Sequence, residues 1–171
     1  IRLFKELSVL DNVKIGLHNQ MSYSTLTGIL RLPKYRKVEA EMDEKAMELL
    51  KVFDLEREAG FLSSNLPYGK QRKLEIARAL ATNPKLLLLD EHTAALDPVV
   101  AERVLHITQD IVAENHITTM MVTHNIGAAL SLGTRTIMLE RGRIVLDLSG
   151  ETRDRLDVPG LLALYREACG A

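Results

Sequence analysis

The stretch that decides the fold is Leu86–Pro98, which reads LLLLDEHTAALDP. Four consecutive leucines predict a strand that is covered on both faces, as in a parallel sheet flanked by helices. Asp90 and Glu91 follow the strand directly, and the crevice beyond the carboxyl ends of such strands is where α/β proteins bind ligands. The pattern therefore predicts a ligand site with two carboxylates. The same residues also fit a buried strand whose acidic end only caps the next turn.

Length and composition are those of an ordinary globular protein. The 171 residues are 46% hydrophobic and 26% charged, enough for one domain with a sizeable core or for two small lobes. A net charge of −1 gives no reason to expect a nucleic-acid partner. Residues 1–83 carry 14 Lys and Arg against 11 Asp and Glu, whereas residues 84–171 carry 8 against 12. This change from +3 to −4 predicts two lobes with different surfaces.

The cysteine count and the uncharged stretches bear on the cellular setting. Cys169 is the only cysteine, which excludes an internal disulfide and favours a reducing compartment. The longest stretch without Asp, Glu, Lys or Arg is His116–Thr134, and its His, Thr, Asn and Ser side chains favour a strand, a turn and a helix over a membrane span. The chain opens at Ile1 without an initiator Met or a leader, so we expect it to begin within a longer protein.

Periodicity, capping residues and turn residues predict the elements. In the first half we expect helices at Val9–Met21 (capped by Ser8 or Asp11), Val38–Ala59 and Lys70–Thr82, with a connector over Ser22–Lys37. After Pro84 we expect strands at Leu86–Leu89, Ile117–Thr123, Thr134–Leu139 and Arg143–Leu148, the last two joined at Arg141-Gly142, and helices at Pro98–Glu114, Asn125–Leu132 and Val158–Ala168. The order predicts a helical lobe over residues 1–83, followed by an α/β lobe over residues 84–171.

Three motifs follow one another at fixed intervals. They are the loop Leu66-Pro67-Tyr68-Gly69-Lys70 that opens a helix, the strand with its acidic pair, and a strand ending in Thr123-His124. In their order and spacing the chain resembles the nucleotide-binding subunit of ATP-binding cassette (ABC) transporters, over essentially all of its length. The resemblance implies a P-loop NTPase-like ABC ATPase fold that is truncated: a helical subdomain, then a partial, mainly parallel sheet with flanking helices and a C-terminal hairpin.

The resemblance also implies roles for the acidic pair and for His124. Asp90 would hold Mg²⁺, which prefers oxygen ligands and neutralises phosphate charge. Glu91 would polarise the attacking water, which requires an ionised carboxylate within hydrogen-bond reach. His124, 33 residues after Glu91, would contact the γ-phosphate of ATP; the alternative is a structural histidine at the end of an apolar strand. His92 departs from the family, which most often has Pro there.

Leu66–Lys70 matches the family's signature loop, commonly Leu-Ser-Gly-Gly-Gln. A Gly-containing turn at a helix N-terminus offers N–H groups and a positive dipole end to the γ-phosphate. Because Pro67 replaces the serine, we expect the backbone near Gly69 to make this contact, aided by Lys70; the alternative is an ordinary helix N-terminus. Ala95-Leu96-Asp97 matches the D-loop, which in the family communicates across the dimer.

The phosphate-cradling loop G-x-x-x-x-G-K-[ST] is missing from these residues. Around Gly69-Lys70 the pattern fails, because Ser64 stands where the first Gly belongs and Gln71 follows the Lys. In the family that loop, the adenine-stacking aromatic and the Q-loop glutamine all precede the point where this chain begins. We therefore expect the stretch alone to bind ATP poorly or not at all, and to expose apolar surface where the absent half would pack.

The resemblance implies an ATP-hydrolysing subunit of an importer at the cytoplasmic face of a prokaryotic membrane, with ATP and Mg²⁺ as cofactors. Residues 65–78 look like branched-chain amino acid importer ATPases, whereas the part from Glu91 onward looks like another importer group. The implied partners are a second ATPase subunit, permease subunits that meet the segment around Phe4–Asn12, and indirectly a solute-binding protein. Two alternatives stay open, a non-transport ABC ATPase and a non-hydrolysing interaction module.

Overall fold

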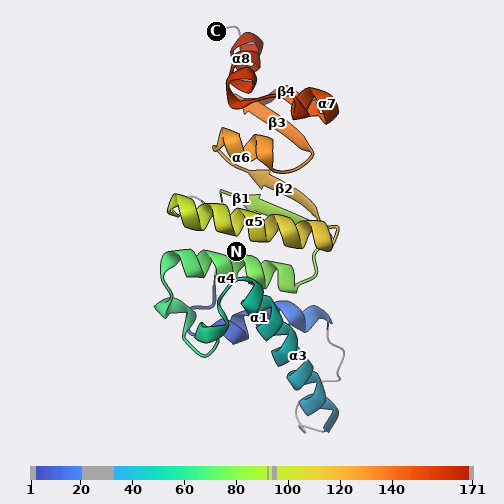
Figure 1. Ribbon diagram of the computed structural model, residues 1–171. Coiled ribbons are helices and arrows are strands. Elements are labelled where there is room, and N and C mark those ends of the chain that lie inside the picture. The colour runs from blue at the N-terminus through green and yellow to red at the C-terminus, as the bar shows by residue number, and fades with distance from the viewer. Residues whose placement is uncertain (1–2, 21–32, 92, 94–95, 170–171) are drawn as a thin grey trace. The chain divides into compact units, whose positions relative to one another are not determined.

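The computed structural model describes residues 3–20, 33–91, 93 and 96–169 (Figure 1). The chain divides into two compact units, the first made of residues 1–88 and 92–120 and the second of residues 89–91 and 121–171. The lobe boundary between residues 83 and 84 stays a prediction. Among the described residues, no helix combines the length and the hydropathy that crossing a membrane requires.

Helices dominate the first unit. They are α1 (Val9–Leu17) with the 3₁₀ turn η1 (His18–Gln20), α3 (Pro33–Val52), the 3₁₀ turns η2 (Glu56–Glu58) and η3 (Ser63–Asn65), α4 (Tyr68–Ala81) and α5 (Pro98–Glu114). Helix α1 packs on α3 and α4, and α4 packs on α5 (Figure 1). Leu50, Phe53, Leu55 and Leu74 are fully buried and form the centre of this core.

Two polar or small residues set how α1 begins and packs. Of the two expected caps, Ser8 is the N-cap: its Oγ accepts from the backbone N–H of Asp11 at 3.0 Å. At Gly16 the helix comes so close to α4 that an added Cβ would lie 2.6 Å from the carbonyl oxygen of Arg78 and 2.8 Å from Cβ of Ala81. Only glycine allows this approach without a shift of one helix.

The prediction of a helix over Val38–Ala59 was wrong at both ends. Helix α3 begins at Pro33 rather than Val38, because a proline in the first turn is pre-organised for a helix and loses no hydrogen bond there. It ends at Val52 rather than Ala59, since Asp54 adopts a left-handed φ of 54° and the chain continues into η2. The connector predicted over residues 22–37 is therefore wrong from Pro33 onward, and residues 21–32 lie outside the described part.

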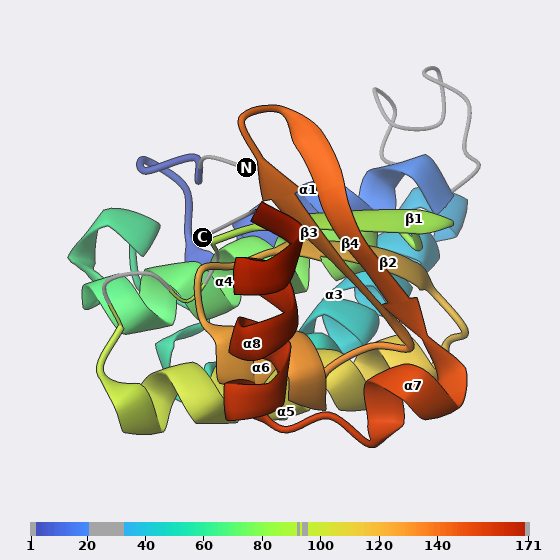
Figure 2. The same cartoon turned by 90° about the horizontal axis from the view of Figure 1, so that it is seen from above.

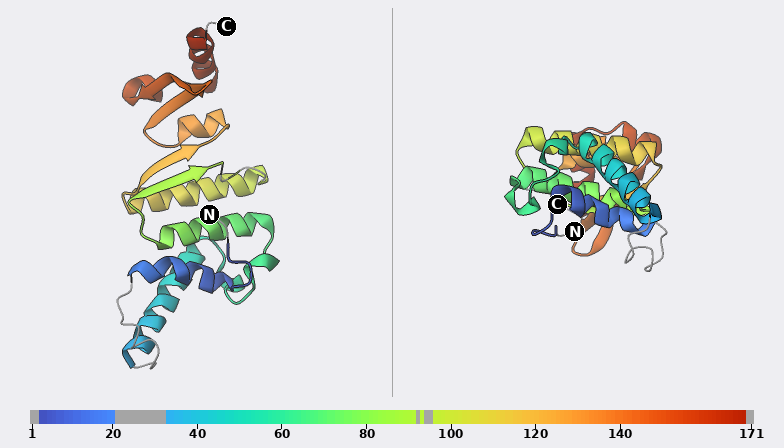
Figure 3. Two further views of the ribbon diagram at one scale, coloured as in Figure 1. Left: turned by 180° about the vertical axis from the view of Figure 1, so that it is seen from behind. Right: turned by 90° about the horizontal axis from the view of Figure 1, so that it is seen from below.

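Strands β1 (Leu86–Asp90) and β2 (Thr118–Val122) form a two-stranded sheet, and α5 connects them in sequence. Figure 3 shows both arrowheads pointing the same way. The expectation that β1 is covered on both faces was wrong: Leu87 and Leu89 are buried, but Leu86 and Leu88 are each 62% exposed. Met120 of β2 is also exposed, so the predicted exposed apolar surface is present at these strands.

The second unit contains a hairpin with short helices. Strands β3 (Arg135–Glu140) and β4 (Arg143–Ser149) pair antiparallel, and the turn residues Arg141 and Gly142 have φ values of 48° and 76°, as the tight hairpin turn predicted from the sequence requires. The helices are α6 (Ile126–Ser131), α7 (Gly150–Asp154) and α8 (Val158–Cys169), of which α7 was not predicted. Figure 2 shows α7 continuing directly from the end of β4. Helices α7 and α8 pack on β4, and α6 contacts α8.

Candidate active site

Glu91 and His124 come together at the ends of the first two strands, within the second unit. Glu91 follows the last residue of β1, and its backbone N–H donates to the carbonyl oxygen of Val122, the last residue of β2, at 3.0 Å. His124 follows two residues later, and its Nδ1 lies 3.2 Å from Oε1 of Glu91. Both side chains are open to solvent, with 75% of His124 and 51% of Glu91 exposed. A ligand can therefore reach both groups.

The backbone at Glu91 is strained. Its φ is 40°, in the left-handed region that costs a residue with a Cβ roughly 1–2 kcal/mol. Such conformations persist only where the surrounding structure holds them, and they gather at active sites. Here the hydrogen bond from Glu91 to Val122 holds the strained residue at the end of the strand.

The loop that carries His124 is fixed on both sides. Before it, Oγ1 of Thr123 accepts from the backbone N–H of Asn125 at 3.0 Å. After it, Oδ1 of Asn125 accepts from the N–H of Ala128 at 3.0 Å and so caps α6. His124 thus lies between the end of a strand and a capped helix.

Asp90 fits a Mg²⁺ ion that is shared with phosphates and water. Its side chain is exposed, and among the described residues it has no hydrogen-bond or ion-pair partner. No group of three or more His, Cys, Asp or Glu side chains in the described part of the chain is arranged to hold a metal by itself. Mg²⁺ does not need such a cage, because it keeps several waters and binds through one or two carboxylates and the substrate's phosphates.

The predicted signature loop forms the start of α4 in the first unit. Helix α4 begins at Tyr68, two residues before the predicted start, with Pro67 as its N-cap. The carbonyl oxygen of Pro67 accepts from the N–H groups of Lys70 and Gln71 at 2.9 and 3.0 Å, and no side chain caps the helix. The N–H groups of Tyr68 and Gly69 precede these and have no acceptor within the helix. Backbone N–H groups are therefore available to an anion at this end of the helix.

The other side chains of this loop are engaged within the same unit. Lys70 Nζ forms an ion pair with Oε1 of Glu58, and no sequence motif marks Glu58 as its partner. The Tyr68 hydroxyl accepts from Nε of Arg72 at 2.9 Å. Leu66 is buried, and its carbonyl oxygen accepts from Nε2 of Gln71 at 2.7 Å.

Asp97 is the N-cap of α5. Its Oδ1 accepts from the N–H of Val100 at 3.0 Å. A Cβ on Gly69 would lie 3.4 Å from Cγ1 of Val100 and 3.7 Å from Cδ2 of Leu96, so the start of α4 packs against the start of α5. The predicted signature loop and Asp97 thus neighbour each other in the first unit. His92, which departs from the family pattern, and Ala95 of the predicted D-loop lie outside the described residues.

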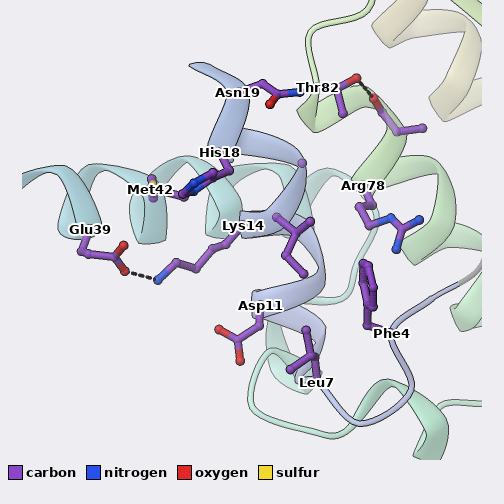
Figure 4. Close-up of a pocket in the computed structure, with 13 residues that line it drawn as sticks. Phe4, Leu7, Asp11, Lys14, His18, Asn19, Glu39, Met42, Arg78 and Thr82 are labelled. Carbon is purple, nitrogen blue, oxygen red and sulfur yellow. Dashed lines mark hydrogen bonds and ion pairs between the residues drawn. The ribbon is translucent and has the colours of Figure 1, made fainter. Parts of the chain in front are cut away.

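A groove of about 1020 Å³ opens between α1, α3 and α4 (Figure 4). Phe4 lies at its edge, 49% exposed, with the guanidinium of Arg78 5.1 Å from the centre of its ring. Burial lowers the pKa of Arg78. Burial also opposes the charge on Lys14, but the hydrogen bonds that its ammonium donates to Asp43 and Glu39 outweigh this effect and raise the pKa of Lys14.

Buried polar groups hold Phe4 at this groove. The fully buried side chain of Asn12 accepts from the backbone N–H of Phe4 at 3.0 Å and donates to its carbonyl oxygen at 3.1 Å. Oγ of Ser63 donates to the same carbonyl at 2.9 Å. The aromatic ring is thus presented from a fixed backbone.

Comparison with known proteins identifies relatives of this chain. Residues 1–94 match the ABC transporter family. The chain is 30% identical to the high-affinity branched-chain amino acid transport ATP-binding protein BraF of Pseudomonas aeruginosa, covering 92% of the chain and 62% of that protein. It is 36% identical to a tyrosine transport ATP-binding protein of Clostridioides difficile, covering 95% and 61%. The chain thus spans about three fifths of the length of these curated relatives.

Solved structures agree with the sequence relatives. The ADP conformation of MJ1267, an ATP-binding cassette of an ABC transporter, superimposes with a TM-score of 0.68 and 28% identity over 94% of this chain and 63% of that one. A dimeric post-hydrolysis state of the cassette MJ0796 bound to ADP and phosphate gives 0.68 and 31% over 86% and 58%. With its fold shared with these cassettes and more than half of its residues matching the family, the chain belongs to the ABC transporter family.

Proposed function

We propose that this chain is part of the ATP-hydrolysing subunit of an ABC importer. The observation that carries the proposal is the 3.2 Å approach of His124 Nδ1 to Glu91 Oε1. It supports a shared task for the two residues that the family resemblance selects, since hydrolysis needs a carboxylate at the attacking water and a group at the γ-phosphate.

Each residue of this cluster has a distinct proposed role. The Glu91 carboxylate accepts a hydrogen bond from the attacking water and so orients and polarises it. The exposed ring of His124 reaches the γ-phosphate while its Nδ1 faces Glu91. Asp90 would hold Mg²⁺, which would neutralise charge on the phosphates.

The start of α4 completes the site of a second subunit. The N–H groups of Tyr68 and Gly69 have no acceptor within the helix, and they lie at the positive end of the helix dipole. Both properties favour binding of an anion such as the γ-phosphate. Lys70 can add charge only by leaving its ion pair with Glu58. Asp97 caps α5 beside this loop. As part of the predicted D-loop, it is proposed to contact the second subunit.

The transported solute is proposed from the relatives. The names of the two relatives refer to branched-chain amino acid and tyrosine transport, which makes amino acids the solute class that we propose here. Since the residues of the cluster act on phosphate and water, the choice of solute rests with a solute-binding protein and the permease.

The groove at Phe4 is the proposed site of the permease subunits, at the cytoplasmic face of the membrane. It presents an exposed aromatic ring on a backbone fixed by Asn12 and Ser63, as a docking surface with a defined shape requires. The exposed leucines of β1 are proposed to be covered by a further part of the cassette. By themselves, these 171 residues are proposed to bind ATP poorly.

The test is Mg²⁺-dependent ATP hydrolysis by the complete subunit, with light scattering to follow pairing when ATP is added. The wild type should hydrolyse ATP and pair, and Asp90→Asn should lose hydrolysis together with the Mg²⁺ dependence of nucleotide binding. Asp110→Asn, an exposed carboxylate on α5, is the matched control and should behave as the wild type. Hydrolysis by Asp90→Asn at the wild-type rate would overturn the assignment.

A further inference from the structure

Arg153 is a buried cation of the second unit that takes no part in the proposed chemistry. It belongs to α7, and only 6% of the residue is exposed. Its Nε donates to Oγ1 of Thr136 at 2.9 Å, and its Nη2 donates to the carbonyl oxygens of Leu130 and Leu132, each at 2.7 Å. One guanidinium thus connects α7, β3 and the end of α6.

The two acceptors of Nη2 are carbonyls at the C-terminal end of α6. The last carbonyls of a helix have no partner within it, and a cation there also interacts favourably with the helix dipole. Thr136 adds to this contact, because its Oγ1 donates to the carbonyl of Ala129 at 2.8 Å. The end of α6 is therefore held by one guanidinium and one hydroxyl, both buried.

The other end of α6 carries His124. Asn125 is the N-cap, and His124 precedes it directly. A helix of six residues is too short to be stable by itself, so its position depends on what holds it from outside. The ring of His124 is largely exposed, which means that its direction is set mainly by the backbone between β2 and α6.

We propose that Arg153 is a positioning residue, which keeps His124 within reach of Glu91 by fixing the C-terminal end of α6. The inference rests on the proposed role of His124 and Glu91 in hydrolysis. This role suits arginine better than lysine. The planar guanidinium can donate hydrogen bonds to several segments at once, whereas the compact ammonium of lysine cannot reach them all. Burying this charge is costly unless its donors find acceptors. Here Nη1 pairs with Oδ1 of Asp154 at 3.3 Å, while Nε and Nη2 donate to the Thr136 hydroxyl and to the carbonyls of the helix end.

The direct test measures the contact between His124 and Glu91 in the complete subunit. In the wild-type background, Glu91→Gln should shift the ring ¹⁵N and ¹³C NMR signals of His124, because the two groups are 3.2 Å apart. In an Arg153→Met background most of that shift should disappear. The amides of Ala129 and Leu132, which donate within α6, should exchange at least about tenfold faster, as the loss of a charged hydrogen bond predicts.

Arg155→Met is the matched control. Arg155 lies two positions further along, is highly exposed and pairs with Glu151 at 2.9 Å on the surface. Its loss should change neither the shift of the His124 signals nor the amide exchange rates in α6. Arg153→Lys keeps the charge but not the planar guanidinium, so it should lose part of the change in the His124 signals that Glu91→Gln causes. If Arg153→Met fails to fold, Thr136→Val decides, because it removes only the shared hydroxyl and should weaken the shift and speed exchange in α6. A folded Arg153→Met, or failing that Thr136→Val, with wild-type shift and exchange would overturn the inference.

Turnover separates this inference from the proposed function. In the complete subunit, Arg153→Met should lower kcat for ATP hydrolysis with little change in KM, whereas Arg155→Met should leave both unchanged. If His124→Ala and Glu91→Gln hydrolyse ATP at the wild-type rate, the proposed function itself is wrong. If those two variants lose turnover while a folded Arg153→Met keeps it, only the positioning role is wrong.

Discussion

Glu91 and His124 are 33 residues apart in the chain, yet Oε1 of the first lies 3.2 Å from Nδ1 of the second. The approach follows from the fold. Strands β1 and β2 pair in one sheet, and the backbone of Glu91 bonds to the last residue of β2. Residues that follow the carboxyl ends of two paired strands lie at the same edge of the sheet, so they are neighbours whatever their separation in sequence.

Loss of the His124 ring should therefore impair hydrolysis rather than nucleotide binding. We expect His124→Ala in the complete subunit to lower kcat by about 100-fold or more, in the range that a positioned acid–base group contributes. KM for ATP should change little. His106→Ala, which removes an exposed histidine of α5, is the control and should hydrolyse normally. A comparable loss in both variants would show that the effect is not specific to this site.

The N-cap of α4 offers a second test. Pro67 caps the helix without a side-chain hydrogen bond, so Pro67→Ser supplies the missing hydroxyl, whereas Pro67→Ala does not. A Ser cap is worth about 1 kcal/mol over Ala, and we expect urea unfolding to show this difference between the two variants. ATP hydrolysis by Pro67→Ser should equal or slightly exceed the wild type. A severe loss of ATP-driven pairing would instead give Pro67 a role of its own.

Close packing of α1 on α4 predicts a large effect of one methyl group. Gly16→Ala places a Cβ 2.6 Å from a backbone oxygen of α4, and overpacking of this kind costs about 1–3 kcal/mol. The control is Gly60→Ala, since nothing lies within 4 Å of a Cβ at Gly60. Thermal unfolding should show a lower Tm for the first variant only. Equal Tm values for both variants would contradict the tight contact.

The ion pairs of Lys14 predict a pH dependence. Because Asp43 and Glu39 raise the pKa of Lys14 above its ordinary value of 10.5 in the folded state, its contribution to stability is complete below pH 10.5 and declines as the pH rises through the raised pKa. The difference in unfolding free energy between the wild type and Lys14→Met should therefore be unchanged from neutral pH to about pH 10 and shrink as the pH rises further. Lys45→Met, an exposed residue on α3, should show no such trend. Shrinkage already at neutral pH would contradict the assignment.

The sequence predicted most of the elements because local signals mark them. Ser8, Asp97 and Asn125 stand at helix N-caps where their side chains accept backbone hydrogen bonds. Arg141-Gly142 supplies the two positive φ values of the hairpin. The motifs placed Glu91 and His124 each after a predicted strand, although the contact between the two side chains was not predicted.

The features that the sequence did not predict depend on long-range contacts. Leu86 and Leu88 read as buried because they are apolar, but what covers a strand is decided by other segments and not by the strand itself. The ion pair of Lys70 with Glu58 joins residues 12 apart across a turn, and the carbonyl acceptors of Arg153 belong to α6. No periodicity in the sequence marks these partners.

The most direct test of the central claim is steady-state ATP hydrolysis by the complete subunit carrying Glu91→Gln, with ATP binding measured in the same preparation. The amide keeps the size of the side chain but removes the negative charge that orients and polarises the water. We expect turnover to fall to background while ATP binding is preserved and the ATP-bound pair becomes longer-lived. Unchanged turnover in this variant would contradict the assignment of Glu91 as the catalytic carboxylate.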